Sequence, residues 1–161
     1  MTSRHKEKIL KPEEINYHGV FDFKEFFSLA KSFFTRYDYD MNEKNYDDKS
    51  SNAIKNIRIK WEMDRKYDDY NRAIITIVYE IKNAKEGYVD GSKVIDGDLK
   101  ITIEADVERD YDEKWGKSAS KRFFMAMYEK LVSGDKQHYV DNLAKDLVKN
   151  FKTEIKQYLK I

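Results

Sequence analysis

The sequence predicts an α+β domain in which helices pack on one face of an antiparallel sheet of four to five strands. Long segments in the middle of the chain alternate apolar and polar residues, which is typical of half-buried strands. Segments on both sides repeat apolar residues every three or four positions, which is typical of amphipathic helices. Asp-Gly pairs between the alternating segments indicate short hairpin loops, which join antiparallel strands. The predicted order is β-α-β-β-(β)-β-α-α, with three helices.

The first strand and the first helix are predicted from the aromatic-rich N-terminal part of the chain. A short strand over 15–20 precedes Asp22, a suitable N-cap residue, and Glu25 follows at the position that completes a capping box. Phe21 and Phe26 flank this cap as a hydrophobic staple. Apolar residues then recur at helical spacing: Phe23, Phe26, Phe27, Ala30, Phe33 and Phe34.

The middle of the chain predicts the long strands of the sheet. Alternation over 57–63, 73–81 and 99–107 places one set of side chains in the core, and Ile74 and Val78 make the second of these strands apolar on both faces. Asp90-Gly91 and Asp96-Gly97 are hairpin signals between them.

The C-terminal third is predicted to be helical. One helix begins at Ser118 or Ser120 and ends at Gly134, and a second, with apolar residues at helical spacing, runs over 140–159. The predicted core comprises Phe26, Phe33, Ile59, Trp61, Ile75, Ile77, Ile101, Ile103, Phe124, Leu131, Leu147 and Phe151.

Two octets share a pattern: MDRKYDDY at 63–70 and VERDYDEK at 107–114. Each lies where an alternating strand ends, and Asp commonly accepts hydrogen bonds from nearby backbone amides in turns and at helix starts. We interpret the likeness as the same local chemistry used twice. The alternative is one paired interaction surface formed by Arg65, Tyr67, Asp68, Arg109, Tyr111 and Asp112.

The segments YHGVFDFKE (17–25) and ERDYDEKWGKS (108–118), set around long alternating strands, resemble a set of small uncharacterised α+β proteins from archaeal genomes. The resemblance spans most of the chain from Tyr17 onward. It implies no activity, cofactor or partner.

Composition indicates a single domain over 13–161 preceded by a basic, flexible arm over 1–12. The chain has 161 residues and no Cys, so disulfides and thiolate sites are excluded. The N-terminus lacks the apolar region of a secretory signal, and no apolar run approaches the roughly 18 residues of a membrane span. We therefore expect a cytoplasmic protein.

Charge is spread unevenly along the chain, although the formal net charge is +1. Residues 1–12 and 113–161 are net basic, and the middle is net acidic. This polarity and the high aromatic content favour a small non-enzymatic interaction or assembly protein that self-associates. Two solvated faces of unequal charge are the simpler interpretation.

Two other binding functions remain open. A strand, a helix, a curved meander and a long final helix look like helix-grip lipid-binding domains, which would bind a small apolar ligand between the sheet and the last helix. A nucleic-acid-binding module using the basic C-terminal helices, with Tyr128, Tyr139 and Tyr158 as stacking residues, is a further alternative. The near-zero net charge argues against nucleic acid.

Catalytic, metal and cofactor sites are not expected. Asp38, Asp40 and Asn42 match the first ligand positions of a calcium loop, but Glu43 and Lys49 stand where Gly and a bidentate Glu are needed. The Ser-x-x-Lys pattern at 118–121 lacks the companion motifs of penicillin-interacting enzymes. The histidines (His5, His18 and His138) are too widely spaced for a metal-binding pattern.

Overall fold

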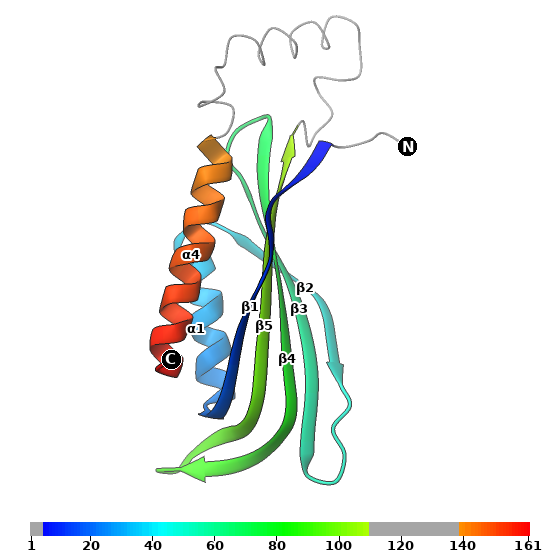
Figure 1. Cartoon of the computed structure of the whole chain (residues 1–161), viewed down its shortest axis with the longest axis vertical. Helices are drawn as coiled ribbons and strands as arrows, with labels where there is room; N and C mark the ends of the chain where they lie inside the picture. Colours follow the sequence, from blue (N-terminus) through cyan, green and yellow to red (C-terminus); the bar gives the residue numbers. More distant parts are fainter. Residues whose placement is uncertain (1–4, 110–138) are drawn as a thin grey trace, which may run out of the picture.

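The structure, a computed structural model, describes residues 5–109 and 139–161. Within this described part, five strands form one antiparallel sheet, accompanied by two helices (Figure 1). In chain order the elements are β1 (His5–Phe21), α1 (Phe23–Arg36), β2 (Asp40–Asp48), β3 (Ile54–Lys66), β4 (Asn71–Val89), β5 (Ser92–Arg109) and α4 (Tyr139–Leu159). The predicted α+β class and antiparallel sheet are therefore confirmed.

The spatial order of the strands is β1-β5-β4-β3-β2. Strands β2 to β5 follow one another as a meander, and β1 pairs with the outer side of β5. Figure 1 shows α1 and α4 together on one face of the sheet, and they contact each other. Of the three predicted helices, the described part holds the first and the last, because the helix expected over 118–134 lies outside the described residues.

The core lies between this face of the sheet and the two helices. Alternate residues of the central strands point toward the helices, and neighbours such as Ile59, Tyr79 and Ile101 form rows across the sheet. The described residues of the predicted core are all buried, and Phe124 and Leu131 lie outside the described part.

The sequence predicted the start of α1 correctly. Asp22 is the N-cap, and its Oδ1 accepts a hydrogen bond from the backbone N–H of Glu25 at 3.0 Å. The rings of Phe21 and Phe26 meet edge to face with centroids 5.6 Å apart, as expected of the staple. This cap fixes which side chains stand in the first turn of α1, beside the end of the sheet.

β1 is longer than the strand that the sequence predicts. It covers His5–Phe21, whereas a strand over 15–20 after a flexible arm over 1–12 was expected. Its first half contains Pro12 and shifts register on both sides of Leu10, so the alternation that marks a strand is interrupted there. Proline is tolerated because β1 is an edge strand.

Residues 5–12 are held against β5 by backbone pairing and by charge. Lys8 Nζ lies 2.8 Å from a carboxylate oxygen of Glu104 and 3.5 Å from one of Asp106. The basic start of the chain therefore lies beside acidic residues of the middle. This pairing neutralises within one molecule part of the charge polarity seen along the sequence.

The segment 38–49, for which the sequence predicts neither a helix nor a strand, forms a tight turn and then β2. Asp38 adopts a left-handed conformation with φ of 61° in this turn, and the strand begins at Asp40. Most side chains of β2 are exposed, so they give no alternating apolar pattern. Pairing with β3 makes this polar segment a strand, and a local pattern does not reveal that pairing.

The two hairpin signals have different outcomes. Asp90-Gly91 forms the predicted two-residue loop between β4 and β5, with positive φ at both residues. Asp96-Gly97 lies inside β5, so the prediction of a turn there was wrong. An added Cβ at Gly97 would lie 2.5 Å from the Cα of Ala84, beside the register shift between Lys82 and Lys85. Gly97 therefore allows a close approach of two strands and does not form a turn.

Candidate functional site

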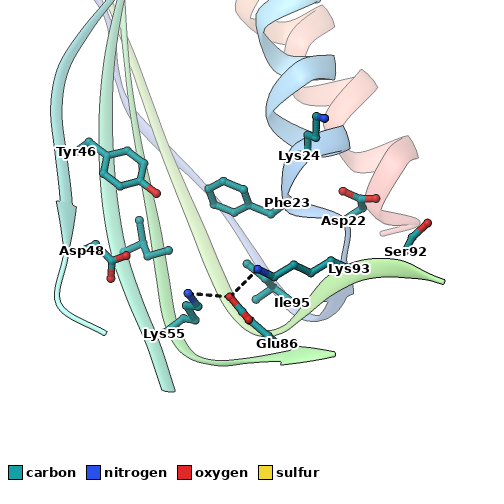
Figure 2. Close-up of a pocket in the computed structure, with 11 residues that line it drawn as sticks. Asp22, Phe23, Lys24, Tyr46, Asp48, Lys55, Glu86, Ser92, Lys93 and Ile95 are labelled. Atoms are coloured by element: carbon teal, nitrogen blue, oxygen red, sulfur yellow. Dashed lines mark ion pairs between the residues drawn. The ribbon is translucent and has the colours of Figure 1, made fainter. Parts of the chain in front are cut away.

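A pocket of about 410 Å³ opens between the start of α1 and the lower ends of the strands in Figure 1. Figure 2 shows its lining, with Phe23 from α1 and Tyr46 from β2 pointing into the space from opposite sides. The side chains of Ile57 and Ile95 complete an apolar wall. Its volume falls within the range of small-molecule sites, which are typically lined by apolar side chains with a few polar groups.

Charged groups surround this apolar wall. Lys24 of α1, Lys55 of β3 and Lys93 of β5 stand on the rim. Lys55 Nζ and Lys93 Nζ lie 2.8 Å and 3.2 Å from the same carboxylate oxygen of Glu86 (Figure 2). Hydrogen bonds from Lys55 and then from Lys93 hold the pKa of Glu86 below its usual range, and the bond to Glu86 raises the pKa of Lys55. The Glu86 carboxylate and the Lys55 ammonium group are therefore charged at neutral pH.

The other carboxylates of the rim are engaged within the protein. Asp22 caps α1 through the amide of Glu25. Asp48 accepts hydrogen bonds from the backbone amide of Ser50 at 2.9 Å and from its hydroxyl, and these bonds lower the pKa of Asp48. Lys24, by contrast, is exposed and forms no ion pair within the described residues.

The local fold explains why the pocket lies at this end of the sheet. The N-cap at Asp22 places Phe23 and Lys24 in the first turn of α1. The register shift in β4 and the close approach at Gly97 accompany the curvature of the β4–β5 hairpin beneath the helices, visible in Figure 1. The hairpin thereby brings Lys93 and Ile95 under the start of α1.

The first octet is a turn held by its aspartate. Asp68 Oδ1 accepts hydrogen bonds from the backbone amides of Tyr70 at 2.8 Å and Asn71 at 2.6 Å, as the local interpretation requires. Its Oδ2 accepts a hydrogen bond from the hydroxyl of Tyr139 at 2.7 Å. The local chemistry predicted for Asp68 is therefore present.

Arg65 and Tyr67 of the first octet contact the chain at the end of α1. Arg65 donates a hydrogen bond to the backbone carbonyl of Tyr37 at 2.9 Å, and its guanidinium lies 4.4 Å from the ring centroid of Tyr67. The hydroxyl of Tyr67 is 3.0 Å from that of Tyr39. These contacts join the end of α1 to β3.

The second octet is described as far as Arg109, because Tyr111 and Asp112 lie outside the described residues. Arg109 bonds Asp141 in the first turn of α4, and Asn71 is its cross-strand neighbour on β4. The start of α4 thus contacts Asp68 and Arg109 at the same end of the sheet. Arg65 is engaged with the end of α1, so it does not join this cluster.

The calcium-loop candidates do not converge on an ion. Asp40 and Asn42 lie in β2, and Asn42 donates a weak hydrogen bond to Asp64 at 3.4 Å. Over residues 5–109 and 139–161, no group of three or more His, Cys, Asp and Glu side chains could hold a metal ion. His18 Nδ1 lies 2.6 Å from Asp98 on the exposed face, and the Ser-x-x-Lys pattern over 118–121 lies outside the described part.

Lysines also line one side of α4. Lys145, Lys149, Lys152 and Lys156 border a shallow groove between α4 and β1, and Lys152 pairs with Glu13 at 2.8 Å. Tyr139 bonds Asp68, and the half-buried Tyr158 packs against Phe26 with ring centroids 6.0 Å apart. These two tyrosines therefore make contacts within the protein, and Tyr128 lies outside the described residues.

No protein-family model and no curated protein sequence matches this chain. Neither described helix is long and apolar enough to cross a membrane.

Sequence reasoning missed every residue of the pocket as a functional candidate. Lys24, Tyr46, Lys55 and Lys93 come from different elements, and none belongs to a motif. The one usable signal was the Asp22 cap, which fixes the start of α1. The pocket itself depends on how far the β4–β5 hairpin curves, and no local pattern encodes that curvature.

Proposed function

We propose that this protein binds a small amphipathic molecule that carries an anionic group. The observation that carries the proposal is the pocket at the start of α1, where an apolar wall of Phe23, Ile57 and Ile95 lies inside a rim of lysines. An apolar body against this wall would be removed from water, which is favourable in proportion to the area buried. We propose a binding role without catalysis.

The balance of donors and acceptors on the rim supports an anionic group. The lining as a whole holds three lysines and three carboxylates, but the cluster of Lys55, Glu86 and Lys93 has a net positive charge, and the ammonium group of Lys24 forms no ion pair within the described residues. Asp22 and Asp48 already accept hydrogen bonds within the protein. Ammonium donors therefore remain available for a carboxylate or a phosphate, each of which supplies acceptor oxygens.

A matched pair of charge reversals tests the proposal. Lys24 lines the pocket, and Lys31 is an exposed lysine on α1 outside the pocket lining. An acidic residue in the first turn is compatible with the helix dipole, so Lys24→Glu should fold normally. We expect Lys24→Glu to weaken binding of decanoate at least tenfold and Lys31→Glu to change it less than twofold.

Isothermal titration calorimetry with decanoate measures these affinities, and decanol and decylamine serve as comparison ligands. The wild-type protein should prefer decanoate to both, because these lack the anionic group. Equal affinity for the three probes would contradict the anionic head group. Absence of binding by all three would overturn the proposed function.

Self-association is a second candidate function, supported by exposed apolar side chains at the β4–β5 hairpin. Tyr88 is 75% exposed and Val89 is 52% exposed, and Val20 of β1 is 47% exposed. A second copy of this chain would cover these side chains. Light scattering across salt concentrations tests the charge-driven form: an oligomer that dissociates as salt rises supports it, and a monomer at low salt contradicts it.

Charge-driven association has less support than the pocket. Lys8 pairs with Glu104, and Lys152 lies 2.8 Å from Glu13, so basic and acidic parts of the sequence meet within one molecule. The aromatic side chains likewise pack together in one core, with Phe33, Phe34 and Phe151 in mutual contact. Both features reduce the charge and aromatic surplus that motivated the assembly hypothesis.

A further inference from the structure

Tyr79 places a hydroxyl group in the centre of the core. The residue is 0% exposed, and its hydroxyl has no hydrogen-bond partner within the described residues. Burying a hydroxyl without a partner is unfavourable, and a phenylalanine would fill nearly the same space without this cost. Buried polar groups in folded proteins are nearly always hydrogen-bonded, so the unpaired hydroxyl of Tyr79 is a candidate contact for a bound molecule.

Tyr79 lies close to the pocket. On β3 the pocket residue Ile57 is two positions from Ile59, the cross-strand neighbour of Tyr79. Both isoleucines belong to the buried core, so Tyr79 is one row of core side chains further in than the pocket wall. Residues two apart on a strand are separated by about 6.6–6.8 Å, so the row of Lys55 and that of Tyr79 lie roughly 13 Å apart.

A thin aromatic layer separates the pocket from Tyr79. The ring of Phe23, which lines the pocket, lies 4.6 Å from the ring of Phe27. The ring of Phe27 in turn lies 4.8 Å from that of Tyr79. Both phenylalanines are half-buried, whereas Phe26 beside them is fully buried. Rotation of Phe27 toward solvent would therefore open a path from the pocket to Tyr79 without breaking the backbone hydrogen bonds of α1.

We propose that the pocket and the Tyr79 hydroxyl are the two ends of one ligand site, which opens when Phe27 rotates. The ligand is an elongated apolar molecule with an anionic group at the lysine rim and an oxygen acceptor at its far end. This inference rests on the proposed function and defines its ligand class more narrowly. Burial raises the pKa of Tyr79 well above its ordinary value, so the hydroxyl keeps its proton and donates to the ligand.

The test compares decanoate with ω-hydroxydecanoate, whose added oxygen lies at the end remote from the carboxylate. We expect the wild-type protein to bind ω-hydroxydecanoate at least tenfold more tightly than decanoate. In Tyr79→Phe this preference should disappear, while affinity for decanoate changes less than twofold. The melting temperature of the free Tyr79→Phe protein should rise, because an unpaired buried hydroxyl has been removed.

Tyr39→Phe is the matched control. Tyr39 is also buried, but its hydroxyl is paired with that of Tyr67 at 3.0 Å. This variant should lower the melting temperature and keep the preference for ω-hydroxydecanoate. A loss of preference in Tyr39→Phe equal to that in Tyr79→Phe would overturn the assignment.

Trp61 provides a second readout, because its ring lies 4.9 Å from that of Tyr79 and 5.6 Å from that of Phe27. With Trp115→Phe as the background, Trp61 is the remaining tryptophan of the chain. Both ligands should shift its emission, since each displaces Phe27.

The outcomes separate the two proposals. Decanoate binding that Lys24→Glu weakens, with no gain from the ω-hydroxyl group and no change in Trp61 emission, would overturn this inference and leave the proposed function standing. Absence of binding by both ligands would overturn both.

Discussion

Arg109 and Asp141 form a buried ion pair that joins the end of β5 to the first turn of α4. Nη2 of Arg109 lies 3.0 Å and 3.3 Å from the two carboxylate oxygens of Asp141. The two side chains are 9% and 10% exposed, and Nη1 of Arg109 lies 2.9 Å from Glu7 of β1. One arginine of the second octet therefore connects β1, β5 and α4.

Asp141→Asn removes one charge of this buried pair and keeps the shape of the side chain. We expect it to lower the free energy of unfolding by about 3–5 kcal/mol, because the guanidinium loses a buried carboxylate partner. Asp146→Asn, an exposed change on the same helix, should stay within about 0.5 kcal/mol of wild type. Urea denaturation measures both, and equal small effects would show that the pair does not hold α4 in place.

Asp68 should make the free energy of unfolding depend on pH in the acidic range. Burial by itself would raise the pKa of Asp68, but hydrogen bonds from Tyr139 and from the backbone amides of Asn71 and Tyr70 outweigh it and lower the pKa. The folded-state pKa is then below the unfolded value of about 3.9, so the ionised carboxylate stabilises the fold above that pH. This contribution should be lost as pH falls through the folded-state pKa.

Tyr139→Phe removes one of these hydrogen bonds, so the pKa of Asp68 should rise toward its ordinary value. We expect Tyr139→Phe to lose less stability than the wild-type protein as the pH falls from about 5 to about 2, a range around the reference carboxyl pKa. Asp68→Ala should cost about 0.5–2 kcal/mol at neutral pH, the range for a lost cap-type hydrogen bond. Carboxyl titration by NMR checks the shift, with Tyr88→Phe as the control, and an unchanged pKa in Tyr139→Phe would contradict the expectation.

Gly97 and Gly87 offer a matched comparison within the same sheet. A Cβ at Gly97 would lie 2.5 Å from both the Cα and the Cβ of Ala84, whereas the nearest atom to a Cβ at Gly87 is Cγ2 of Val94 at 4.0 Å. We expect Gly97→Ala to destabilise by about 1–3 kcal/mol, as overpacking does. Gly87→Ala should change stability by less than about 1 kcal/mol in thermal unfolding. Equal melting temperatures for the two variants would refute the close approach.

Deletion of residues 1–12 distinguishes a strand from a flexible arm. Because residues 5–12 pair with β5, the deletion should lower the free energy of unfolding by at least about 2 kcal/mol. It also exposes part of the β5 edge, so aggregation should increase in light scattering. Lys8→Gln keeps the strand and should cost less than about 1 kcal/mol. Unchanged stability of the deletion variant would instead support the prediction of a flexible arm over residues 1–12.

Elements whose signals are local agreed with the sequence prediction. The Asp22 cap, the Phe21–Phe26 staple and the Asp90-Gly91 loop each involve residues within a few positions of one another, so sequence spacing specifies them. The alternation that buries Ile59 and Ile101 depends on strand geometry and needs no knowledge of the partner strand.

Elements that depend on distant partners did not agree with the sequence prediction. β2 carries few apolar residues and is a strand because β3 lies beside it, and residues 5–12 extend β1 because β5 offers carboxylates and backbone partners. Gly97 shows that a clear local signal can also mislead. The Asp-Gly pair is a good turn signal, yet glycine is needed here because Ala84 of the neighbouring strand lies so close.

By itself the sequence determined the α+β class, the antiparallel pairing and most of the core, because backbone geometry translates residue periodicity directly into buried faces. Tertiary structure decided the candidate site. Lys24, Lys55 and Lys93 line one pocket, and the hydroxyl of Tyr79 has no hydrogen-bond partner within the described residues, because of how the helices and the sheet pack together. Whether a charge or a hydroxyl is paired depends on atoms far away in the chain, and their positions are set when the whole core packs.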